Sequence, residues 1–205
     1  VESMLKPEEM RQFAERSGIH AVGWFAASDF ADYLAAIGRA AHYHRIVYRP
    51  LEAFLQAGRV PDGIRTVIVL VMDYFVESSE QPAGCRLSNY SRACWSTVDP
   101  KAEALATFLR AKGVRAERLD LPQRAAACRA GLGFVGKNAL FYAYGLGSYV
   151  GIASIGTDAA IEGALPGEER VSDPACSDCN RCVAACPVSA IPPEGYRIDP
   201  LRCLS

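Results

Sequence analysis

The sequence predicts a mixed α/β (α+β) fold for residues 1–165, followed by a small cysteine-rich module at residues 166–205. Short apolar segments alternate with amphipathic helical segments over the first part, which is the pattern of helices packed on a sheet. Residues 158–174 are rich in Glu, Gly, Asp and Pro, a composition typical of a linker or surface loop. Four of the eight cysteines then fall between residues 176 and 186.

Helices are expected where apolar residues recur every three or four positions between starting and ending signals. The first begins with Pro7 in its first turn and ends before Gly18. In the second, we expect Ser28 to be the N-cap, with Phe30, Tyr33, Leu34 and Ile37 on the buried face. Two more helices are expected, from Asp99-Pro100 to Ala111 and over the Ala-rich residues 123–129.

Strands are expected at four short apolar segments, His20–Ala27, Arg65–Phe75, Val114–Leu119 and Tyr149–Ile155. The second of these carries β-branched residues on both faces, so it is expected to be a central strand.

No apolar run has the length of a membrane span, and no charged-then-apolar leader opens the chain. Eight cysteines without a secretion signal indicate a reducing cytoplasm. The net charge of −1 argues against a surface that is strongly basic on average.

The cysteine run carries the clearest functional signal. Cys176, Cys179, Cys182 and Cys186, followed by Pro187, have the spacing C-x2-C-x2-C-x3-C-P of bacterial ferredoxins. Three thiolates on a tight loop can hold three corners of a [4Fe–4S] cluster, and we expect the fourth cysteine to open a helix and serve a different cluster. A zinc site fits less well, because zinc hooks are usually separated by a longer stretch. Electron transfer is therefore the first hypothesis for function.

Cys203 follows Cys186 by seventeen residues. We predict that Cys176, Cys179 and Cys182 bind one [4Fe–4S] cluster and that Cys186 and Cys203 serve a second. Five cysteines cannot complete two sites that each need four thiolates. If a single cluster forms, Cys203 or Cys186 is expected to be its fourth ligand.

A glycine-rich segment is the second candidate site. Gly131, Gly133 and Gly136 match G-x-G-x-x-G, but a helical segment precedes them where a dinucleotide site requires a strand. The same segment matches G-x4-G-K at Lys137, but Asn138 replaces the Ser or Thr that would bind Mg²⁺. The glycines predict either a structural turn or a close approach to a flat cofactor, with Lys137 and Asn138 supplying polar contacts.

Other chemically capable residues are scattered. His42 and His44 could share one face of a strand and bind metal, but a solvated or capping pair is favoured because no third ligand is apparent. Cys85, Cys94 and Cys128 are interpreted as structural thiols.

Four segments together resemble the epoxyqueuosine reductase family. They are R-P-L-E-A-F-L at 49–55, A-G-L-G-F-V-G-K-N-A-L at 130–140, G-L-G-S-Y-V-G-I-A-S-I at 145–155 and the cysteine run. The resemblance covers most of the chain. It implies a nitroreductase-like, cobalamin-binding domain followed by a ferredoxin-like module, as in the related reductive dehalogenases. It also implies that clusters pass electrons to the cobalt of a corrinoid lying against the glycine segment. The substrate would be a tRNA nucleoside, and the electron donor a ferredoxin or flavodoxin rather than a membrane component.

The chain departs from the family pattern in three places. Leu119–Arg124 reads L-D-L-P-Q-R where the family has D-x-x-P-V-L-E-R, and only Tyr90 remains of a Y-x-x-x-x-D-Y-H box. The resemblance makes Asp120 and Tyr90 the candidates for proton delivery. The alternative for Asp120, slightly favoured, is that it only starts the turn before Pro122, a common use of Asp. The family's second cysteine run is absent after Arg202–Ser205. An iron–sulfur electron carrier or regulatory protein without its own substrate, or a scaffold held by its cluster, remain the alternatives.

Overall fold

The computed structural model describes residues 4–39, 55–74, 88–169, 173–199 and 201–204. Its centre is a four-stranded sheet in the order β2-β3-β7-β4, in which every neighbouring pair is antiparallel. The bounds of its strands are Ala21–Ala26 for β2, Thr66–Asp73 for β3, Ala116–Leu119 for β4 and Val150–Thr157 for β7. All four predicted strands are therefore confirmed, and the antiparallel pairing is that of an α+β protein.

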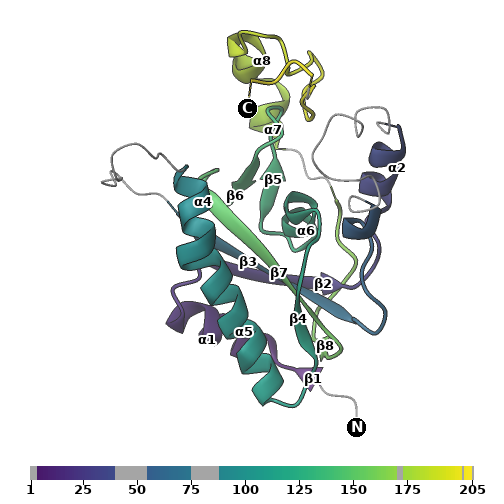
Figure 1. Cartoon of the computed structure of the whole chain (residues 1–205), viewed down its shortest axis with the longest axis vertical. Coiled ribbons are helices and arrows are strands. Elements are labelled where there is room, and N and C mark those ends of the chain that lie inside the picture. The colour runs from purple at the N-terminus through teal and green to yellow at the C-terminus, as the bar shows by residue number, and fades with distance from the viewer. Residues whose placement is uncertain (1–3, 40–54, 75–87, 170–172, 200, 205) are drawn as a thin grey trace.

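Strand β3 is buried on both faces, as its sequence predicts. Ile68, Leu70 and Met72 point into one hydrophobic core, and the alternating residues Val67, Val69 and Val71 point into a second. All six are completely buried. The sheet is thus a middle layer between the two cores (Figure 1). The sheet with its two cores, in the described residues from 4 to 157, is called the sheet domain below.

Helices α1 (Pro7–Arg16) and α5 (Asp99–Ala111) supply the first core, through residues such as Met10 and Leu105. The second core is closed by α6 (Gln123–Arg129) and by a hairpin of β5 (Gly133–Val135) and β6 (Phe141–Ala143). Helix α2 (Ala31–Arg39) lies at the edge of this second face (Figure 1). The helices predicted over residues 7–17 and 123–129 are confirmed.

The helix predicted from Asp99-Pro100 to Ala111 is confirmed as α5, but it is not where the helical segment begins. Helix α4 (Asn89–Ala93) and a π-helical turn, η2 (Cys94–Val98), run directly into α5. The N-cap of the whole is Ser88, whose hydroxyl accepts a hydrogen bond from the Ser91 amide at 3.1 Å. Proline marks a helix start because it lacks an N–H, but an irregular turn before it can absorb the missing donor.

Ser28 does not act as the expected N-cap of α2. Its hydroxyl accepts a hydrogen bond from Arg129 at 3.1 Å, and the helix begins three residues later. The Glu169 carboxylate instead accepts hydrogen bonds from the amides of Asp32 and Tyr33, at 3.2 and 3.0 Å. Of the predicted buried face, Phe30 is fully buried and Tyr33 packs on the second core, while Ile37 lies outside the described side chains.

Of the segment 158–174, the described residues 158–169 pack on the sheet domain at several points. Within them, β8 (Ala160–Ile161) pairs in parallel with β1 (Met4–Leu5), at the end of the molecule opposite the cysteine run (Figure 1). Together with the contacts of Glu169, this pairing corrects the interpretation of the segment as a linker, whereas residues 162–169 do form a loop. The prediction rested on composition, which does not reveal one buried carboxylate, that of Glu169, or a strand of two residues, β8.

Helices α7 (Pro174–Ser177) and α8 (Arg181–Ala185) lie together beyond the β5–β6 hairpin (Figure 1). Neither contains a buried residue. Among the described residues, no helix combines the length and apolar character needed to cross a membrane. His42, His44, Cys85 and residues 49–54 lie outside the described residues.

Candidate cofactor cleft and cysteine module

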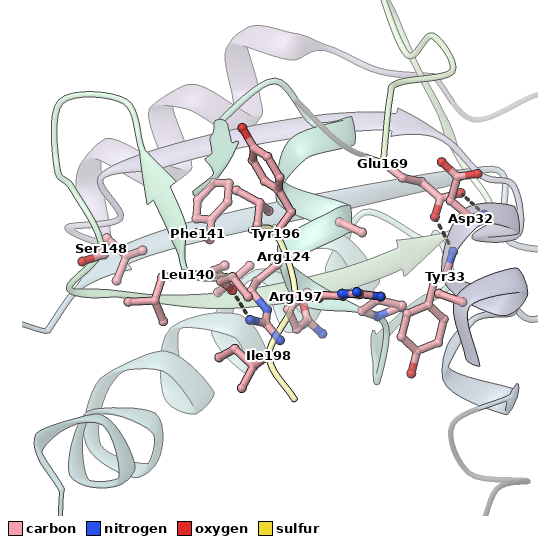
Figure 2. Close-up of a pocket in the computed structure, with 18 of the residues that line it drawn as sticks. Asp32, Tyr33, Arg124, Leu140, Phe141, Ser148, Glu169, Tyr196, Arg197 and Ile198 are labelled. Atoms are coloured by element: carbon pink, nitrogen blue, oxygen red, sulfur yellow. Dashed lines mark hydrogen bonds between the residues drawn. The ribbon is translucent and has the colours of Figure 1, made fainter. Parts of the chain in front are cut away.

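A cleft of about 950 Å³ opens between the sheet domain and the segment that follows the cysteine run (Figure 2). Its floor and walls are largely apolar, with a few polar side chains among them, as in typical sites for organic cofactors. The lining residues come from α2, α4, α6, the β5–β6 hairpin, β7, the C-terminal segment and several loops between elements. They are Asp32, Tyr33, Ala36, Tyr74, Tyr90, Pro122, Gln123, Arg124, Ala125, Val135, Ala139, Leu140, Phe141, Ser148, Val150, Ile152, Glu169, Tyr196, Arg197 and Ile198.

Tyr90, predicted as a site residue, lines this cleft. Its side chain is 52% exposed, and the aromatic ring of Tyr74 packs against it at 5.6 Å between ring centroids. Partial burial and a hydrogen bond with the Cys94 side chain raise the pKa of Tyr90 to about 12. The phenol therefore stays protonated at neutral pH and can donate a hydrogen bond or a proton into the cleft.

Arg124 is a lining residue that the sequence prediction missed. Its guanidinium donates a hydrogen bond to the Ala139 carbonyl, so α6 is tied to the turn of the β5–β6 hairpin (Figure 2). The same positive charge partly opposes the rise in the pKa of Tyr90. The signal was present, because Arg124 is the arginine of L-D-L-P-Q-R.

Asp120, the other predicted catalytic residue, is exposed on the loop between β4 and α6. The described residues that line the cleft include Pro122 from the same loop and Gln123 from the start of α6 but not Asp120. Its role in proton delivery stays a prediction.

The glycine segment runs from the end of α6 through β5: Gly131 follows the helix, Gly133 begins the strand and Gly136 starts the hairpin turn. A Cβ atom at Gly133 would lie 2.1 Å from the Tyr142 carbonyl oxygen, and one at Gly136 would lie 2.7 Å from the Tyr142 ring. Gly131 has open space around it, but its φ of +71° favours glycine. All three glycines thus have structural reasons to be glycine. Contact with a cofactor stays a prediction, since the hairpin lines the cleft through Val135 and Leu140 instead.

Lys137 and Asn138 make contacts within the protein. The Lys137 ammonium donates hydrogen bonds to the Ser177 carbonyl at 2.7 Å and to Asn180 Oδ1 at 2.8 Å. The Asn138 amide donates to the Tyr142 hydroxyl at 2.9 Å, and its Oδ1 accepts from the Leu140 amide at 3.2 Å. Lys137 therefore connects the hairpin to the cysteine run, whereas Asn138 shapes the hairpin turn.

A buried ion pair supports the wall of the cleft beside α2. Arg129 Nη2 lies 2.9 Å from Glu169 Oε1, with only 7% and 9% of the two side chains exposed. The Arg129 guanidinium also stacks on the Phe30 ring at 4.0 Å and donates to the Asp29 carbonyl at 2.7 Å. Since Glu169 also caps α2, this one pair positions the helix that carries Asp32 and Tyr33 into the cleft (Figure 2).

In the cysteine run, two sulfur atoms accept backbone hydrogen bonds. The amide of Lys137 donates to Cys176 Sγ at 3.3 Å, and the amide of Ala190 donates to Cys186 Sγ at 3.2 Å. Hydrogen bonds from the Ala190 and Val188 amides lower the pKa of the Cys186 thiol and so favour the thiolate that binds metal. Cys186 ends α8 rather than opening a helix, which corrects that expectation.

The chemistry of this donor set fits an iron–sulfur cluster, because four thiols and amide-to-sulfur hydrogen bonds are what such clusters use. The side chains themselves are not gathered as ligands. In the part of the chain that the structure describes, no three His, Cys, Asp or Glu residues converge as a metal site.

Cys203 lies near the turn that follows Cys186. The Asp199 amide donates to the Ala190 carbonyl at 2.7 Å, and the Cys203 amide donates to the Asp199 carbonyl at 3.0 Å. Through Ala190, these hydrogen bonds link Cys203 to Cys186. Cys176 belongs to a separate set of contacts, those made by Lys137.

Several epoxyqueuosine reductases are similar to the chain in sequence. No family model matches it. The epoxyqueuosine reductase of Lactococcus garvieae is 30% identical over 217 residues, which cover 97% of this chain and 59% of that protein. That of Bacillus subtilis is 25% identical over 224 residues, covering 97% of this chain and 54% of the relative. The chain thus spans a little over half the length of these curated relatives.

Solved structures share the fold. An epoxyqueuosine reductase from Bacillus subtilis superposes with a TM-score of 0.74 at 22% identity, covering 96% of this chain and 55% of the other. A catabolic reductive dehalogenase superposes with a TM-score of 0.59 at 16% identity, covering 90% of this chain and 25% of that one. The mixed α/β fold is therefore shared with both groups of structures, and the chain is similar in sequence to epoxyqueuosine reductases over nearly its whole length.

Proposed function

We propose that this chain is the redox core of a reductase resembling epoxyqueuosine reductase. In this proposal, residues 1–165 form a nitroreductase-like domain that holds a corrinoid, and residues 166–205 form a ferredoxin-like module that holds one or two [4Fe–4S] clusters. The clusters supply single electrons and the corrinoid a reducible cobalt. Oxidoreductase chemistry is supported by the family of the relatives.

The proposal rests on one observation: both parts of the chain contribute residues to the wall of the cleft. Residues Tyr196–Ile198, which follow the cysteine run, face α6 and the hairpin across the cleft (Figure 2). A cofactor in this cleft would therefore touch both parts of the chain. Its volume of about 950 Å³ is at the upper end of the range of about 300–1,000 Å³ for organic ligands.

Within the cleft, Val135, Leu140 and Phe141 would hold an apolar face of the cofactor and exclude water. Tyr90 would hold a proton at its hydroxyl near the reacting atoms, since its pKa is raised to about 12. Arg124, on the same wall, would offset negative charge that develops during a reduction.

Asp120 would act as the acid after its loop moves. In one solved epoxyqueuosine reductase from Bacillus subtilis, the catalytic aspartate loop is swung out of the active site. Asp120 likewise lies outside the cleft, on the loop before α6. An Asp120→Asn variant that binds cofactor normally but loses reductive turnover would support this role, and wild-type turnover would refute it.

The proposed substrate is an oxidised nucleoside in a tRNA, with a cytoplasmic ferredoxin or flavodoxin as the electron donor. An epoxyqueuosine reductase with an epoxyqueuosine-modified tRNA stem loop has the same fold, with a TM-score of 0.71 at 23% identity. The alternative is an iron–sulfur carrier or regulatory protein without its own substrate, which the position of Asp120 outside the cleft favours.

Cobalamin titration separates these functions. The full chain is reconstituted with iron and sulfide under anaerobic conditions, and cobalamin binding is followed by ultraviolet–visible absorption. Leu140→Arg places a charge in the apolar cleft, so we expect affinity to fall by about tenfold or more. Leu165→Arg, at an exposed leucine outside the cleft lining, is the matched control and should bind like wild type. A cluster spectrum without cobalamin binding in wild type, or equal affinity in Leu140→Arg, would refute the cofactor site.

A further inference from the structure

We propose that Lys137 is a positioning residue for the cysteine run and sets the ease with which its cluster is reduced. Lys137 holds the loop that begins at Cys176 against the glycine hairpin and places a buried positive charge beside it. The effect on reduction rests on the proposed function, because it requires a bound cluster. The effect on the loop does not.

Lys137 contacts the cysteine run at three points. Its amide donates to Cys176 Sγ at 3.3 Å, and its ammonium donates to the Ser177 carbonyl at 2.7 Å and to Asn180 Oδ1 at 2.8 Å. Ser177 directly follows Cys176, and Asn180 directly follows Cys179. One side chain thus bridges the two ends of the first C-x2-C loop.

The segment after the cysteine run encloses Lys137 from a second direction. The Tyr196 amide donates to the Lys137 carbonyl at 2.8 Å. Gly195, with a φ of +72°, packs so closely that a Cβ there would lie 2.5 Å from Lys137 Cγ. The residue is consequently only 8% exposed, which is unusual for a lysine.

Because Lys137 is buried, its charge acts on the cysteine run more strongly than exposed charges nearby do. Asp178 and Arg181, on either side of Asn180, are exposed, so water and salt screen their effect on the run. The Lys137 ammonium is screened much less. When a [4Fe–4S]²⁺ cluster takes one electron from a reductant it becomes [4Fe–4S]⁺, and a nearby positive charge favours that more negative form.

The test compares three variants of the reconstituted full chain in a redox titration with dithionite, followed by electron paramagnetic resonance. Lys137→Met removes the charge and should shift the midpoint potential to a more negative value. Lys137→Arg keeps the charge and should remain closer to wild type. Lys101→Met is the matched control, because the Lys101 ammonium also binds a backbone carbonyl, that of Gly18, away from the cysteine run. Equal midpoints in wild type and Lys137→Met would overturn the inference.

Hydrogen–deuterium exchange on the same chain without iron tests the positioning role of Lys137 independently of any cluster. Peptides containing Ser177 and Asn180 should exchange several-fold faster in Lys137→Met than in wild type, and at the wild-type rate in Lys101→Met. Unchanged exchange in Lys137→Met would overturn the positioning role even if that variant failed to take up iron. If wild type itself binds no iron, the proposed function fails, whereas faster exchange in Lys137→Met would still support the positioning role.

Discussion

The sheet domain and the cysteine module are held together by different means. In the sheet domain, β3 alone buries six apolar side chains completely, and two cores cover its faces. In the described residues 173–199, only Ala190 and Gly195 are buried. Hydrophobic burial can therefore stabilise the first region more than the second. The second is held by contacts such as those of Lys137, and in our proposal its thiols also bind a cluster.

The largest expected effect concerns ligation. Cys179→Ser should abolish cluster assembly, because a missing thiolate leaves an iron corner open. Iron and sulfide analysis after anaerobic reconstitution measures this, and Cys94→Ser, in the helix outside the run, should keep its iron. Unchanged iron in Cys179→Ser would remove the cluster from the account of this module.

The buried ion pair between Arg129 and Glu169 tests whether the described residues 158–169 are held against the sheet domain. Glu169→Ala leaves Arg129 buried without its partner, which should lower the free energy of unfolding by about 3–5 kcal/mol. Glu103→Ala is the control, because its pair with Arg110 is exposed and should contribute less than about 1 kcal/mol. Urea unfolding followed by circular dichroism compares the two, and equal small losses would mean that the pair does not hold the segment.

Core truncation in each region sharpens the contrast. Leu105→Ala empties a fully packed site between α5 and the sheet, so the free energy of unfolding should fall by about 2–5 kcal/mol. Val183→Ala, in a helix with no buried residue, should lower it by less than about 1 kcal/mol. If both variants lose the same stability, the module has a core that burial does not reveal.

The smallest expected effect is the pH dependence from Tyr90. Its pKa is raised to about 12 from an ordinary value near 10, so the folded state keeps a proton that the unfolded state loses. Stability should thus be unaffected below pH 10 and should fall as pH rises toward 12. Because half of the side chain is exposed, we expect about 1 kcal/mol or less, and Tyr90→Phe should remove it. Urea unfolding at pH 9 and pH 11 measures this, and an identical decline in Tyr90→Phe would show that other groups cause it.

The sheet domain and the cysteine module also differ in how much of their structure could be predicted from the sequence. The strands and most helices of the sheet domain follow from local composition and apolar patterning, as in the continuous apolar run of β3 and the Ala-rich run of α6. Contacts between distant segments could not be predicted in this way. Glu169 binds the start of α2 from more than a hundred residues away, and no local sequence pattern marks that contact. The π-helical turn before Pro100 was missed for a related reason, since proline is a local signal and the preceding turn overrides it.

In the candidate site, the cysteine run was recognisable because metal ligation requires fixed spacing. Tyr90 was indicated by the family motif and lies in the cleft. The role of Tyr196–Ile198 in the cleft could not be predicted, because it depends on how the module folds back on the hairpin through Lys137. The glycines were noticed, but their packing against Tyr142 only became apparent in three dimensions.

The central claim is that the cysteine module delivers electrons to a cofactor in the adjacent cleft. Electron paramagnetic resonance of the reconstituted, dithionite-reduced chain, recorded with and without cobalamin, tests it most directly. We predict a [4Fe–4S]⁺ signal in the absence of cobalamin and a smaller one in its presence, with the cobalamin retained on a desalting column. A cluster signal of the same size in both samples, with cobalamin lost on the column, would contradict the account.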